Sequence, residues 1–236
     1  MKEKLIKKIS SHQVLYNEVI LEFGPGETKV YSNSIGLDVV QKESVDVQCV
    51  LPNILYDVPD NSIDLIYSSH FLEHIESLEE LMKQVNRILK PGGKMISIVP
   101  HFSNPYYHSD YTHKRPWGLY TLLYFSSDIF FKRNVPRYYN LVDFKLLDIK
   151  LKFASPFRIT NRLKIVWEKL FNLNRRTMEI YEEHFCWIIP CYEIRFVIEK
   201  KIINIIEKPK KKKSNMAVVG MYFFTNDVIK KTKILK

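Results

Sequence analysis

The stretch Val19-Ile20-Leu21-Glu22-Phe23-Gly24-Pro25-Gly26 decides how this chain folds. An apolar run that leads into an acid and two closely spaced glycines is typical of a buried parallel strand and the turn that follows it. Because Gly24 and Gly26 have no side chains, a ligand can approach the backbone of this turn. A second apolar run ends at Asp38, where nucleotide-binding α/β folds place a carboxylate for ribose hydroxyls. These two strand ends therefore predict a crevice for a nucleoside-containing cofactor.

Three further stretches follow in a fixed order. Residues 60–67 read DNSIDLIY, residues 70–75 read HFLEHI and residues 89–94 read LKPGGK. Together with the glycine turn they resemble the ordered motifs of class I S-adenosylmethionine (SAM) dependent methyltransferases of the type-11 group. The resemblance implies a Rossmann-like α/β fold, with a mostly parallel seven-stranded sheet whose last strand is antiparallel.

The same resemblance implies SAM as the cofactor and S-adenosylhomocysteine as its product. It places the glycine turn near the methionine part, Asp38 on the ribose and the end of the fourth strand near the sulfonium. Asn53 stands nearest to the family's adenine-contacting position, although a plain turn role fits it as well. The implied cofactor-binding residues are Glu22, Phe23, Gly24, Pro25, Gly26, Asp38, Asn53, Ser69 and His70. His74, a turn further on, is assigned to packing at a helix start.

The chain departs from the family pattern at its first crossover. Only residues 27–34 separate the glycine turn from the second strand, which is too short for the usual crossover helix. Apolar residues at helical spacing predict a helix over residues 77–89, and residues 95–99 read as the fifth strand. Residues 192–200 are predicted as the final antiparallel strand, with residues 216–225 as a rival.

A helical insert is expected before that last strand. The residues Leu163, Val166, Trp167, Leu170 and Phe171 form one apolar stripe at helical spacing. We expect this stripe to pack on its own domain. A membrane surface or a partner subunit is the alternative, because the other face carries Arg162, Lys164 and Lys169.

The loop after the fifth strand concentrates groups suited to acid–base chemistry, namely His101, His108, Asp110 and His113. Methyl transfer to a hydroxyl needs a general base with a pKa near neutrality, and histidine suits that task. We predict these four residues as catalytic and predict no metal. Two alternatives stay open: a divalent metal on His108, Asp110 and His113, or a purely structural loop.

The composition of the chain indicates which partners it binds and where in the cell it is found. A formal net charge of +10 over 236 residues favours anionic partners. Arginine and lysine in the second half, namely Lys114, Arg115, Lys132, Arg133 and Arg137, suit a phosphorylated or nucleotide-linked acceptor. The chain has three cysteines without a paired motif, no apolar run long enough for a membrane span and a charged N-terminus. We therefore expect buried cysteines and a cytoplasmic protein, with a homodimer as one possible assembly.

One domain is predicted over residues 1–236, with a SAM-binding half (1–100), an acceptor-binding half (101–201) and a basic C-terminal extension (202–236). The resemblance is to small methyltransferases of bacterial capsule and lipopolysaccharide loci. It implies O-methylation of an activated sugar or of a phosphate-linked group, including a phosphoramidate. Two other hypotheses are a nucleic-acid (RNA) methyltransferase, suggested by the charge and by Asn104-Pro105-Tyr106, and a non-catalytic SAM-binding scaffold subunit. We consider a nucleic-acid partner the weaker choice, because no recognition domain is evident.

Overall fold

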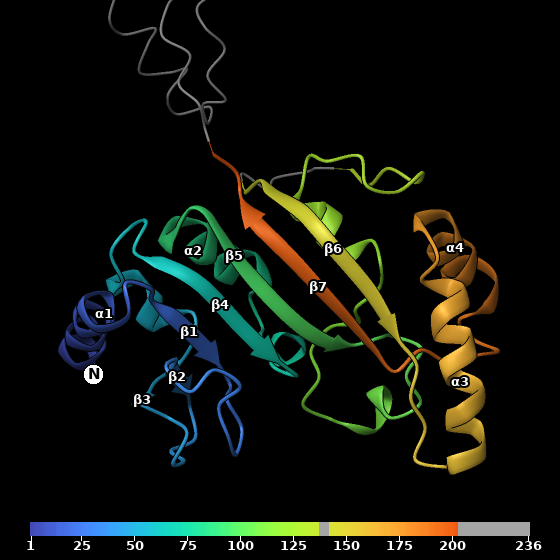
Figure 1. Ribbon diagram of the computed structural model, residues 1–236, viewed down its shortest axis with the longest axis horizontal. Helices are drawn as coiled ribbons and strands as arrows, with labels where there is room; N and C mark the ends of the chain where they lie inside the picture. Colours follow the sequence, from blue (N-terminus) through green and yellow to red (C-terminus); the bar gives the residue numbers. More distant parts are fainter. Residues whose placement is uncertain (137–141, 203–236) are drawn as a thin grey trace, which may run out of the picture. The chain divides into compact units, whose positions relative to one another are not determined.

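A computed structural model describes residues 1–136 and 142–202 of the chain. The chain divides into two units, residues 1–201 and residues 202–236, and the fold described below is that of the first unit. This unit is built on one seven-stranded sheet with the strand order β3-β2-β1-β4-β5-β7-β6 (Figure 1). The predicted mostly parallel sheet is confirmed, because β7 alone runs opposite to the direction of the other six strands.

The first half of the sheet follows the predicted order of strands and turns. Its strands are β1 (Ile20–Phe23), β2 (Ile35–Asp38), β3 (Val47–Gln48), β4 (Ile63–Ser69) and β5 (Leu89–Pro100). Its helices are α1 (Lys2–Tyr16), α2 (Leu78–Ile88) and the 3₁₀ turns η1 (Asn53–Asp57) and η2 (Leu72–His74). No helix lies between β1 and β2, which confirms the shortened first crossover.

The second half adds two strands and the predicted helical insert. Its elements are η3 (Tyr107–Ser109), η4 (Thr121–Phe125), β6 (Phe144–Lys152), α3 (Arg158–Phe171), α4 (Arg175–Ile180), the π-helical turn η5 (Tyr181–Phe185) and β7 (Glu193–Lys200). Strand β7 lies between β5 and β6 and pairs antiparallel with both, so residues 193–200 form the last strand of this sheet. The rival segment, residues 216–225, lies outside the described residues.

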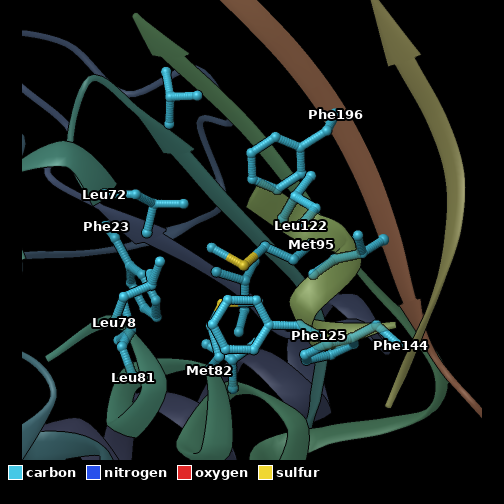
Figure 2. Close-up of a cluster of buried hydrophobic side chains, with 14 of the residues drawn as sticks. Phe23, Leu72, Leu78, Leu81, Met82, Met95, Leu122, Phe125, Phe144 and Phe196 are labelled. Carbon is cyan, nitrogen blue, oxygen red and sulfur yellow. The ribbon is translucent and has the colours of Figure 1, made fainter. Parts of the chain in front are cut away.

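The core lies between the sheet and α2 and shows why the first half folds as predicted. The apolar residues of α2, namely Leu78, Leu81, Met82, Val85 and Ile88, are all buried. Figure 2 shows Leu78, Leu81 and Met82 gathered with Met95 of β5 and with Phe125 of η4. Because helical spacing puts these side chains on one face, burial against the sheet stabilises the helix that the sequence predicts.

The insert departs from the prediction in one respect. Helix α3 packs beside the edge strand β6 (Figure 1), but of its apolar stripe only Phe171 is buried and Trp167 half-buried. The side chains of Leu163, Val166 and Leu170 remain exposed. The expectation that the whole stripe packs on its own domain is therefore wrong, because an edge strand offers the helix only a narrow apolar surface.

The three cysteines Cys49, Cys186 and Cys191 are buried and free, as predicted. Among the described residues, no helix has the length and the apolar character needed to cross a bilayer.

Candidate cofactor and acceptor site

The glycine turn and Asp38 lie at neighbouring strand ends. The backbone N–H of Gly24 donates to the carbonyl of Leu37 at 2.9 Å, and Phe23 and Leu37 are paired across β1 and β2. Asp38 is the next residue and ends β2. The structure therefore brings the turn and the acid to one edge of the sheet, where ligands of open α/β sheets bind.

Gly24 is required by its surroundings. Its φ of +62° is in the left-handed region, and a Cβ added here would lie 2.9 Å from Cδ2 of Phe71. Phe71 follows β4, so the turn is closely approached by the chain from a third strand end. The backbone N–H of Gly24 is already used, and Pro25 has none. The turn thus lets another side chain come close to its backbone at Gly24. Gly26, with φ of +65°, is the second residue of the turn in the left-handed region.

Glu22 shapes the short crossover. Its side chain is buried, and its carboxylate accepts hydrogen bonds from the Val30 N–H at 2.9 Å and from the Ser34 hydroxyl at 2.9 Å. These bonds replace the support that a crossover helix would give. Among the predicted cofactor-binding residues, Glu22 therefore holds the short crossover between β1 and β2.

Asp46, which the sequence analysis did not single out, fastens the same crossover from the side of β3. Its carboxylate accepts from the Gly36 N–H at 2.8 Å and from the ammonium groups of Lys8 and Lys29. Burial alone would raise the pKa of the Asp46 carboxyl, but these hydrogen bonds outweigh it and hold the pKa below its usual value. The signal in the sequence was an acid between two buried valines, Val45 and Val47, at the start of β3.

Asp38 and Asn53 both have side chains that are at least partly exposed. Oδ1 of Asp38 accepts from the Val40 N–H at 2.8 Å, which fixes the orientation of the carboxylate. Asn53 is exposed at the start of η1. Cys49 also lies here: its N–H donates to the Asp38 carbonyl at 2.7 Å, and burial together with the Asp38 charge raises the pKa of its thiol to about 11. Cys49 therefore stays a neutral thiol beside Asp38.

His70 follows Ser69 at the end of β4 in a left-handed conformation, with φ of 51°. Its Nε2 lies 2.9 Å from Oε1 of Glu193, and its Nδ1 lies 3.4 Å from Oε1 of Glu73. The hydrogen bond to Glu193, followed by the contact with Glu73, raises the pKa of His70 to about 9. The imidazole is therefore positively charged at neutral pH, and the two carboxylates offset its charge at this strand end.

His101 is enclosed by the protein. It is fully buried, its Nδ1 accepts from the Ser103 N–H at 3.0 Å, and its Nε2 donates to Oε2 of Glu182 at 3.3 Å. The Glu182 carboxylate also accepts from the Leu119 N–H at 2.9 Å. His101 thus ties the loop after β5 to the helical insert, and both of its ring nitrogens are occupied.

The other predicted catalytic residues are not gathered around His101. His108 is exposed and lines a cavity of about 480 Å³ together with Phe102, Tyr120, Glu182 and Trp187. Asp110 accepts from the Thr112 N–H at 2.9 Å, and its Oδ2 lies 3.6 Å from Nε2 of His113. The structure therefore separates the four residues. His101 is buried against Glu182, His108 lines the cavity, and Asp110 lies beside His113.

Several of the basic residues in the second half interact with other side chains or with the backbone. Arg133 lies over the ring of Tyr120, with Cζ 4.9 Å from the centroid, and Lys114 lies 3.5 Å from a carboxylate oxygen of Glu76. The Arg115 guanidinium donates to the Glu76 carbonyl. Arg137 lies outside the described residues.

The side-chain amide of Asn104 also makes hydrogen bonds within the protein. It donates to the Tyr192 carbonyl at 2.9 Å and accepts from the Tyr106 N–H at 2.9 Å. The side chain of Asn104 therefore helps to hold this loop in place.

Comparison with known proteins agrees with the fold. Residues 27–97 match a family model described as a methyltransferase domain. Residues 193–236 match a model described as a nucleotidyl transferase, and of that range the structure describes residues 193–202, which include β7 of the same sheet. The residues matched by the first model include β2, β3, β4, α2 and most of β5 of the mostly parallel sheet.

Individual relatives are similar over short stretches. Phosphoethanolamine N-methyltransferase 2 of Caenorhabditis elegans is 32% identical over 56 residues, which are 24% of this chain and 13% of that protein. Sterol 4-C-methyltransferase strm-1 of the same organism is 43% identical over 37 residues, which are 16% of this chain and 11% of that protein. The crystal structure of a SAM-dependent methyltransferase from Archaeoglobus fulgidus has a TM-score of 0.49 and 16% identity, with 85% of this chain and 95% of that chain covered.

Proposed function

We propose that the protein is a SAM-dependent methyltransferase that O-methylates a small activated sugar or a phosphate-linked precursor of a bacterial surface polysaccharide. One observation carries the cofactor assignment: the Gly24–Leu37 hydrogen bond puts the glycine turn beside Asp38. The methyltransferase-domain match over residues 27–97 supports it. A cytoplasmic location and a homodimer stay predictions.

The residues at the crevice fit the proposed cofactor. The backbone at Gly26 is open, because no atom lies within 4 Å of where a Cβ would stand, whereas the ring of Phe71 fills that space at Gly24. Asp38 offers a carboxylate at the strand end for ribose hydroxyls. Bound SAM supplies a methyl group on a sulfonium, ready for displacement by a nucleophile. The task of the protein is then to align the nucleophile, the methyl carbon and the sulfur and to exclude water.

The cavity beside His108 is our proposed acceptor site. Its aromatic walls, which include Phe102, Tyr120 and Trp187, with a few polar groups among them, are typical of small-molecule sites. We assign the general-base role to His108, because its imidazole is exposed at this cavity whereas both nitrogens of His101 are occupied. Arg133, next to Tyr120, supports a preference for a phosphate on the acceptor.

The relatives make other acceptors worth testing. Their names assign methylation of phosphoethanolamine and of a sterol to those proteins, and each match covers only a small part of the relative. Phosphoethanolamine shares a phosphate with the acceptor class proposed for this chain. A sterol has no phosphate. Comparing methyl transfer to phosphoethanolamine and to a sterol therefore distinguishes a preference for phosphate from a preference for an apolar acceptor.

Calorimetric titration of the full chain with SAM tests the cofactor assignment, and transfer of a labelled methyl group to nucleotide sugars, phosphoethanolamine and a sterol tests the acceptor. We expect Asp38→Asn to weaken SAM binding about tenfold or more, the equivalent of about 1.4 kcal/mol for a lost charge-assisted hydrogen bond. Asp148→Asn, an exposed strand aspartate of β6, is the matched control and should bind normally. No binding of SAM by the wild-type chain would contradict the proposal.

His108→Asn tests the acceptor half separately. We expect it to lower methyl transfer about 100-fold, the lower range for loss of a general base, while SAM affinity is unchanged. Unchanged turnover would remove His108 from the mechanism and leave the cofactor assignment intact.

A further inference from the structure

Three metal-binding side chains converge at the end of β4, beyond the residues assigned to SAM. Glu73 and His74 belong to η2, and His113 lies in the loop after η3. One ligand atom of each lies within 4.8 Å of the other two. We propose that Glu73, His74 and His113 bind one divalent ion of the zinc type.

The state of Glu73 is the first argument. This carboxylate is fully buried, and neither oxygen makes a hydrogen bond within the described part of the chain. Its close charged or ionisable neighbours are His70, with Nδ1 at 3.4 Å, and His74, with Nε2 at 4.0 Å. A buried carboxylate without hydrogen bonds is costly, and buried charges are normally paired or bound to a metal. The charge of His70 is offset in part by Oε1 of Glu73, but Oε2 makes neither a hydrogen bond nor an ion pair among the described residues, and a metal ion would satisfy it.

The hydrogen bond at Nδ1 of His74 is the second argument. The Thr112 hydroxyl donates its single proton to Asp110, so its contact with Nδ1 of His74, at 2.9 Å, is one in which the imidazole donates. The proton of a neutral His74 is therefore on Nδ1, and Nε2 presents a lone pair toward Glu73. A hydrogen bond from the second nitrogen to an oxygen is the usual support of a metal-binding histidine.

His113 is held in the same way. Its Nδ1 lies 2.9 Å from the Tyr107 carbonyl, which can only accept, so the proton of the neutral ring is again on Nδ1. The rings of His74 and His113 have their centroids 4.9 Å apart. Both imidazoles use Nδ1 in a contact with an oxygen, which leaves Nε2 as the ring nitrogen available to a metal ion. The Asp110 carboxylate, 3.6 Å from Nε2 of His113, adds negative charge at the edge.

This donor set selects the kind of ion. Two imidazoles and one carboxylate suit zinc and its neighbours among the transition metals, whereas calcium and magnesium prefer oxygen ligands alone. Metal–ligand distances are about 2.0–2.2 Å, so the ligand atoms need to approach one another by about 1 Å on binding. Three protein ligands leave a position open for water or a substrate oxygen.

The test is metal binding by the full chain after treatment with a chelator, with Co²⁺ as a spectroscopic probe and Zn²⁺ as its competitor. We expect one Co²⁺ per chain, visible d–d bands and displacement by Zn²⁺. Glu73→Gln, His74→Asn and His113→Asn should each weaken binding at least about 100-fold, since even outer-shell partners are worth about 10–100-fold. Circular dichroism of each variant shows whether the fold is kept.

Two further variants make the test specific. His184→Asn removes an exposed histidine that also lies beside a glutamate, Glu183, and should leave Co²⁺ binding unchanged. Thr112→Val keeps all three ligands but removes the acceptor for Nδ1 of His74, and should weaken binding about tenfold. X-ray absorption of the zinc-loaded protein should show two imidazole nitrogens.

Absence of stoichiometric Co²⁺ and Zn²⁺ binding by the wild-type chain would overturn the proposal. Metal binding that survives all three ligand substitutions in folded protein would overturn it as well. Neither readout uses SAM or methyl transfer, so the metal site and the proposed function can fail separately.

Discussion

Helices α2 and α3 carry the same kind of apolar stripe in the sequence but have different surroundings in the structure. All five stripe residues of α2 are buried against the sheet, whereas Leu163 and Val166 of α3 keep 58% and 61% of their surface exposed. The spacing of apolar residues predicts that a helix forms. It does not show how wide a surface the rest of the fold offers to cover it.

Polar side chains do for α3 what apolar packing does for α2. Asn172, directly after α3, accepts from the Leu151 N–H at 2.8 Å and donates to the Leu151 carbonyl at 2.7 Å. Glu168 accepts from the Phe153 N–H at 3.0 Å. The insert is therefore fastened to the edge of the sheet by these hydrogen bonds together with the ring contacts of Phe171 with Phe153 and Tyr181. Because most of the apolar stripe of α3 is exposed, we expect the insert to open locally before the first half of the sheet unfolds.

The largest effect is expected in the core beside α2. Leu81→Ala should lower the free energy of unfolding by about 2–5 kcal/mol, because Leu81 is fully buried and its loss leaves a cavity. Urea denaturation measures the change. Leu81→Met conserves volume and should cost less than about 1.5 kcal/mol. A cost below 1 kcal/mol for Leu81→Ala would mean that α2 does not depend on packing in the way described.

The next effect concerns the polar fastening of the short crossover. Asp46→Asn should lower stability near neutral pH by about 1–3 kcal/mol, since its hydrogen bonds to Lys29, Lys8 and the Gly36 amide are charge-assisted. The pKa of Asp46 is lowered by folding, so its contribution is present above the ordinary carboxyl pKa of about 3.9 and is lost as the pH falls through the folded value.

Urea unfolding of wild type and Asp46→Asn at a series of pH values checks this sign. The stability difference between the two should shrink as the pH falls below about 4. A difference that grows on acidification would contradict the assigned direction of the pKa shift.

A smaller and local effect is expected at the junction of α3 and β6. Asn172→Ala removes hydrogen bonds at both the N–H and the carbonyl of Leu151, and should cost about 1–2 kcal/mol. Hydrogen exchange should show faster exchange in α3 and at the β6 edge, with α2 and β4 unchanged. Equal acceleration in α2 would show that the insert and the first half unfold together.

The smallest effect is expected on the exposed face of α3. Leu163→Ser should change the free energy of unfolding by less than about 0.5 kcal/mol, because the side chain is mostly exposed. Analytical ultracentrifugation of the same variant tests the predicted homodimer. If this face is the dimer interface, the variant dissociates at concentrations where the wild-type chain stays paired.

Local order in the sequence was enough to predict the strands, the glycine turn and the position of Asp38. Each of these depends on residues a few positions apart, and parallel strands bring their carboxyl ends together by geometry. The same local reasoning predicted α2 and offered residues 192–200 as one of two choices for the last strand, and the structure shows residues 193–200 in the sheet.

The sequence did not predict contacts between residues that lie far apart along the chain. His101 is paired with Glu182 of the insert, and His113 lies beside Glu73 and His74, which the sequence separates widely. A histidine-rich loop shows that polar chemistry is concentrated there, but which of its members meet depends on how the loop folds over η2. How much of the apolar stripe of α3 is buried likewise depends on the surface that the edge strand β6 offers.

The most direct test of the central claim is a crystal structure of the full chain with S-adenosylhomocysteine. The account predicts ribose hydroxyls within hydrogen-bond distance of the Asp38 carboxylate, and the methionine part against the backbone of Gly24 to Gly26. A ligand bound elsewhere, with Asp38 free of the ribose, would contradict it.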